Sequence, residues 1–68
     1  MQMTAVLTPA EEGGYVAFNP ETGTTSQGDT VELAVAALRE AVELYLEDGP
    51  IALPGTPLVT TFTVGEHA

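Results

Sequence analysis

The sequence predicts a small α+β domain in which one helix packs on one face of a small antiparallel sheet. Three observations lead to this fold class. Strand-like runs occupy the first 26 residues, a helical pattern of apolar residues follows over 30–47, and a further alternating run occupies 58–64. The expected order is strand, strand, strand, helix, strand, within a single domain spanning 1–68.

The first three elements are expected to be strands. Residues 1–8 alternate with the period of two that is typical of a half-buried strand. Residues 9–14 contain proline and a glycine pair, which indicate a turn, and 15–18 are rich in strand-forming side chains. A hairpin between the two runs is therefore expected, with a short third strand at 24–26.

The helix is expected to begin near Thr30 and to end at the run Asp48-Gly49-Pro50. Gly28 permits the turn into the helix. Two residues are candidates for the N-cap of this helix. One is Asp29, with Glu32 three residues later as in a capping box, and the other is Thr30. A phosphate-binding loop is excluded, because such loops need a lysine and this chain has none.

The apolar arc of this helix is wider than one face of a small sheet covers. It spans about 220° of the helical wheel, where about 100° is usual. The residues that widen it are Leu33, Ala37 and Leu44. Either loops or a second subunit cover this flank. Because a chain of 68 residues without cysteine needs another source of stability, we expect a homo-oligomer, a dimer or larger, that associates through these residues.

The C-terminal part is expected to form a loop at 51–57, a last strand at 58–64 and a frayed tail at 65–68. The alternation of apolar and threonine residues in 58–64 supports the strand.

The charge of the chain restricts its partners. Ten carboxylates stand against one basic residue, Arg39, for a net charge of −9. Such a chain should repel nucleic acid and anionic membranes. Its acidity either attracts basic proteins or only keeps a small protein in solution. The sequence has no apolar run long enough to span a bilayer and no recognisable signal peptide. A cytoplasmic location is therefore expected.

No constellation of side chains predicts an enzyme or a cofactor. His67 is the only imidazole and stands next to the last residue, so it has no triad or ligand partner. Glu11 and Glu12 could bind a divalent ion together with Glu21 or Asp48, but their spacing does not match a calcium-binding loop.

Residues 23–48, GTTSQGDTVELAVAALREAVELYLED, resemble the HicB-type antitoxin domain. The matching positions are Gly23, Ser26, Gly28, Asp29 and Thr30 in the loop, and Ala34, Leu38, Glu40, Ala41 and Tyr45 in the helix. Upstream, GGYVAFNPE is similar to the strand and proline loop of that family. The chain departs from the pattern at Thr24, where cysteine is common, and at Leu33, where glutamate is common.

The resemblance implies an antitoxin that binds and blocks HicA, a small basic ribonuclease. Many HicB proteins carry a DNA-binding domain; because this chain ends at the last expected strand and has one arginine, we expect a short form without that domain. We expect the acidic side chains to occupy the basic RNA-binding surface of such a partner. The expected contact residues are Glu32, Glu40, Glu43 and Glu47 on the helix and Glu21 in the loop after the second strand.

Overall fold

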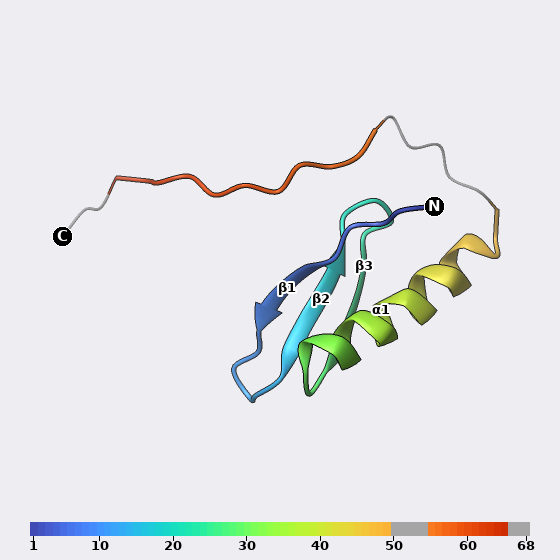
Figure 1. The fold of residues 1–68 in the computed structure, drawn as a ribbon, viewed down its shortest axis with the longest axis horizontal. Coiled ribbons are helices and arrows are strands. Elements are labelled where there is room, and N and C mark those ends of the chain that lie inside the picture. Colours follow the sequence, from blue (N-terminus) through green and yellow to red (C-terminus); the bar gives the residue numbers. More distant parts are fainter. Residues whose placement is uncertain (50–54, 66–68) are drawn as a thin grey trace.

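The computed structural model describes residues 1–49 and 55–65 and contains a three-stranded sheet crossed by one helix (Figure 1). The elements are β1 (Val6–Pro9), β2 (Tyr15–Asn19), β3 (Thr24–Gly28) and α1 (Val31–Leu46). The strands are antiparallel and lie in the order β1-β2-β3. The predicted α+β class, with one helix on one face of a small antiparallel sheet, is confirmed.

The predicted hairpin and third strand are confirmed, with different boundaries. In the turn of the hairpin, the N–H of Ala10 donates to the carbonyl of Gly14 at 3.0 Å. β3 continues to Gly28, two residues beyond its predicted end. β1, predicted over 1–8, begins only at Val6. Val6 pairs with Phe18, one residue before the end of β2, so residues 1–4 have no strand beside them.

The core is small and is made of small side chains. Its buried apolar residues are Ala17, Ala34, Leu38 and Val42. Ala17 pairs with Leu7 on one side and with Ser26 on the other, so these three side chains point to the same face of the sheet. The helix packs over β3 and β2 and leaves the β1 side of that face largely uncovered.

Gly28 lies directly beneath the first turn of α1. A Cβ atom at this position would lie 2.5 Å from the backbone nitrogen of Ala34, closer than real contacts of this kind. Gly14, whose φ is +78°, approaches Gly28 from the hairpin turn, and a Cβ there would lie 2.7 Å from the Gly28 carbonyl oxygen. The helix, β3 and the hairpin turn therefore meet at a point where only backbone fits.

Thr30 caps the helix. Its backbone is extended, and its Oγ1 accepts a hydrogen bond from the N–H of Leu33 at 3.1 Å. The alternative cap, Asp29 paired with Glu32, is wrong, because the first helical residue is Val31 and Asp29 stands one position too early. With Thr30 and Glu47 as caps, the observed helix matches the predicted range of 30–47.

The predicted last strand at 58–64 is not formed on the sheet of this chain. These residues extend away from the sheet and pair with no strand among the described residues (Figure 1). The alternation of apolar and polar residues predicts that an extended segment has two different faces. It does not determine which other strand lies beside the segment, and a sheet requires one. Parts of the predicted loop (51–54) and tail (66–68) lie outside the described residues.

We expect Gly28→Ala to lower the free energy of unfolding by about 1–3 kcal/mol, because the new methyl group would displace the first turn of α1. Urea denaturation followed by circular dichroism measures this change. Gly55→Ala is the matched control, since a Cβ there meets nothing within 4 Å. Equal stability of the two variants would contradict the close contact.

Candidate protein-binding surface

The solvent-facing side of α1 is acidic. The four predicted contact residues on the helix, Glu32, Glu40, Glu43 and Glu47, are all exposed. Arg39 is the only basic residue of the chain, and its Nε lies 3.8 Å from Oε2 of Glu43. Both side chains of this pair are mostly exposed, so the pair adds little stability. The surface therefore keeps a clear negative charge.

An apolar strip lies beside these carboxylates on one flank of the helix. It consists of Leu33, Ala37 and Leu44, which helical spacing places in line. Leu33 is 54% exposed and Leu44 is 65% exposed. Hence no loop among the described residues covers this flank. Self-association through the strip stays a prediction, and the strip is equally available to another protein.

A shallow hollow continues this surface at the hairpin end of the sheet. Three carboxylates, Glu11, Glu12 and Asp29, line it together with Leu33, and its volume is about 650 Å³. The antiparallel order brings these residues together, because the β1–β2 turn and the β3–α1 connection lie at the same end of the sheet. In the sequence these acids stand on two separate segments, so their proximity was not predicted.

The described residues contain no group of three histidine, aspartate or glutamate side chains placed to hold a metal ion. Glu11 and Glu12 lie on the hairpin turn, whereas Glu21 lies on the β2–β3 loop at the other end of the sheet. The combination of Glu11 and Glu12 with Glu21 is therefore not assembled. The alternative with Asp48 is not assembled either among the described residues, because Asp48 follows the C-terminal end of α1, whereas the hairpin turn lies near the start of this helix. His67 lies outside the described residues.

Glu21 has an internal role in the structure. Its carboxylate accepts hydrogen bonds from the backbone N–H of Thr4 at 3.0 Å and from the Thr4 hydroxyl at 2.8 Å. The side chain of Asn19, which is fully buried, donates both to Glu21 and to the carbonyl of Thr4. The network ties the N-terminal segment to the β2–β3 loop. The sequence pointed to Glu21 as a partner contact or a metal ligand and not to this network, because no local pattern links residues 17 positions apart.

The network also changes the acidity of Glu21. Burial acts to raise the pKa of the Glu21 carboxyl group, but the hydrogen bonds from Thr4 and Asn19 outweigh it, so the pKa lies below the ordinary value of 4.5. The charged form is therefore the one that the fold stabilises.

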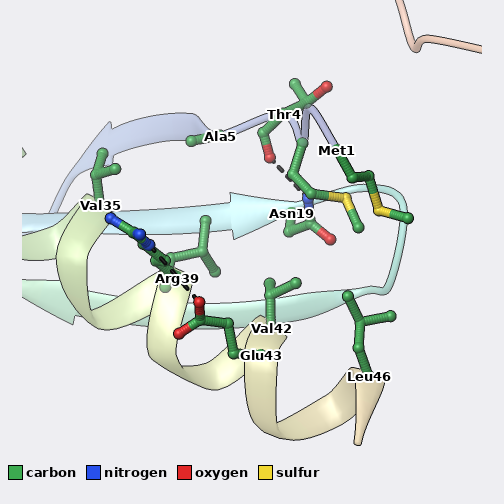
Figure 2. Close-up of a pocket in the computed structure, with 11 residues that line it drawn as sticks. Met1, Thr4, Ala5, Asn19, Val35, Arg39, Val42, Glu43 and Leu46 are labelled. Carbon is green, nitrogen blue, oxygen red and sulfur yellow. Dashed lines mark hydrogen bonds and ion pairs between the residues drawn. The ribbon is translucent and has the colours of Figure 1, made fainter. Parts of the chain in front are cut away.

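A second hollow, an apolar groove, lies between the N-terminal segment and the opposite flank of α1 (Figure 2). Its volume is about 480 Å³. Its walls come from Met1, Met3 and Ala5 on one side and from Val35, Val42 and Leu46 on the other. The groove offers apolar contact along the edge of the sheet.

Two relatives from Synechocystis sp. are similar to this chain. The UPF0150 protein ssl0738 is 46% identical over 48 residues, which cover 69% of this chain and 67% of that protein. The chain belongs to the UPF0150 family. The UPF0150 protein ssr1765 is 49% identical over 45 residues, or 65% of this chain and 57% of that protein.

The chain thus spans about two thirds of the length of ssl0738 and a little more than half of the length of ssr1765. No family model matches the chain, and no solved structure matches it significantly. Within the described residues, α1 is too short and too polar to cross a membrane.

We expect Glu21→Gln to make the chain less stable at pH 7 and equally stable in acid. Because folding lowers the pKa of Glu21, the stabilisation is present above the unfolded value of 4.5 and is lost as the pH falls through the folded value. Thermal unfolding of both proteins from pH 7 to pH 3 measures the difference. Glu12→Gln, on the hairpin turn, removes the same charge as a control. A difference between wild type and Glu21→Gln that is independent of pH would contradict the network.

Proposed function

We propose that this UPF0150 chain is an antitoxin-like binding module that neutralises a small basic ribonuclease of HicA type. It would act by covering the surface with which the ribonuclease binds RNA. The observation that carries the proposal is the acidic side of α1, where exposed glutamates flank the exposed side chains of Leu33 and Leu44.

The charge of the chain supports this partner class. A ribonuclease surface that binds RNA presents lysine and arginine to the phosphates. A chain with a net charge of −9 attracts such a surface and repels RNA itself. Carboxylates speed the encounter and fix the orientation, whereas apolar side chains excluded from water hold the complex together. The glutamates of α1 and the apolar strip would serve these two purposes.

The resemblance to the HicB-type domain supports the same reading. The residues that carry its loop pattern have structural roles here, since Gly28 contacts α1 and Thr30 caps it. They therefore indicate a shared scaffold. Leu33 stands where a glutamate is common in the family and lies on the proposed binding surface. The contact made by this chain would be more apolar at that point.

Co-purification with the product of the neighbouring reading frame tests this function. We expect a complex at low salt that weakens as salt rises, and relief of RNA cleavage when this chain is added. No complex at low salt, or undiminished cleavage in its presence, would rule the proposal out.

Charge reversal locates the contact. We expect the double substitution Glu40→Lys and Glu47→Lys to weaken binding at least about tenfold, because two repulsive contacts replace two attractive ones. The control is Thr8→Lys with Thr25→Lys, which adds two lysines at exposed positions on the face of the sheet opposite to α1. Titration calorimetry measures both. Equal losses would indicate a general charge effect without a defined contact on α1.

A second function is a structural or regulatory homo-oligomer without a toxin partner or enzymatic activity. The exposure of Leu33 and Leu44 favours it, because apolar side chains in water are typical of a covered surface. An isolated gene would support this function, and a small basic reading frame beside the gene would count against it.

We expect Leu33→Lys with Leu44→Lys to lower the mass of such an oligomer in light scattering. Ala36→Lys, at an exposed position of the same helix, is the control and should leave the mass unchanged. A protein that is monomeric before substitution, with the same mass afterwards, would exclude association through the strip.

A further inference from the structure

Residues 58–64, called the arm here, carry an apolar row that the described structure leaves in water. In an extended chain every second side chain points the same way, which aligns Leu58, Phe62 and Val64 with Thr60 between them. These three side chains are 89%, 85% and 68% exposed. No backbone hydrogen bond joins the arm to the sheet or the helix among the described residues. Such a row requires a covering surface.

The β1 edge offers a surface that fits an extended apolar segment. β1 is an outer strand, so the backbone groups on its free side have no partner strand among the described residues. Because α1 packs over β2 and β3, the apolar groove opens beside the segment that leads into β1, between Ala5 and Val35 (Figure 2). A strand laid along β1 would hydrogen-bond to its edge and place alternate side chains in the groove.

The distribution of charge also favours the arm as the segment that fills the groove. Residues 55–65 contain no charged side chain, although the whole chain carries −9. Arg39 and Glu43, the charged residues that line the groove, pair with each other. An uncharged apolar strand therefore fits the groove better than a basic peptide, and the arm is the segment of this chain with that composition.

The arm does not lie on its own sheet. Figure 1 shows it extending away from β1, and the radius of gyration is 14.2 Å. A compact domain of this length would have about 11 Å. If the arm of each copy lay in the groove of the other, both arms and both grooves would be covered, because a two-fold axis repeats each contact. It would also enlarge a core in which only four apolar residues are buried within the described chain.

We propose that the arm of one copy lies along the β1 edge of a second copy, with Leu58, Phe62 and Val64 in the groove, and that the exchange is reciprocal. The resulting dimer uses the flank of α1 opposite to the apolar strip. It therefore leaves Glu32, Glu40, Glu47 and Leu33 free for another protein, whereas Glu43 lines the groove.

Light scattering over a range of protein concentrations tests the exchange. We expect wild type to be a dimer and Phe62→Asp to be a monomer with unchanged helix content. Thr61→Asp adds the same charge to the other face of the arm and should remain dimeric. A monomeric wild type, or a dimeric Phe62→Asp, would overturn the proposal.

Cross-linking decides whether the contact joins two chains. The chain has no cysteine, so Ala5→Cys and Thr60→Cys can be made singly, mixed and treated with a short bismaleimide. We expect a covalent dimer that contains one chain of each kind. The yield should drop when Phe62→Asp is added to the arm. A chain that carries both cysteines is treated in the same way. If the mixture gives no such dimer and the chain with both cysteines links only within itself, the arm folds onto its own sheet and the proposal is wrong.

Discussion

The contact between the backbone of Gly28 and the first turn of α1 determines where the helix lies. Small residues continue the contact further along, since Ala34 of the helix and Ala17 of the sheet are both fully buried. Helix and sheet can approach closely only because no large side chain stands between them. This approach holds α1 over β3 and β2, and the two flanks of the helix acquire different surroundings. One flank faces the groove beside β1, and the other carries the apolar strip in solvent.

Much of the fold could be predicted from the sequence, because it depends on local patterns. The period of two located the hairpin, and the helical period located α1 within a residue at each end. The exposure of Glu32, Glu40, Glu43 and Glu47 followed from the same helical period. The cap was narrowed to two neighbouring residues, and only the observed start of the helix distinguishes Thr30 from Asp29.

The features that were missed or wrong depend on contacts between distant residues. The start of β1 is set by the end of β2, and the 58–64 run lacks a partner strand that its own pattern cannot provide. The bonds from Thr4 to Glu21 link a segment without regular structure to a loop. The hollow lined by Glu11 and Asp29 arises from the antiparallel order of the sheet. In each case the missing information was which segments become neighbours.

The uncharged, extended arm has a consequence for the lifetime of the chain. Proteases act most readily on exposed segments that lack regular structure, and the arm has this form in a single copy. In the proposed dimer the arm would be part of a sheet and protected from cleavage. Degradation would then be fastest when copies are few and would slow as they accumulate, since pairing depends on concentration. Through this one segment, the abundance of the protein would influence its own rate of removal.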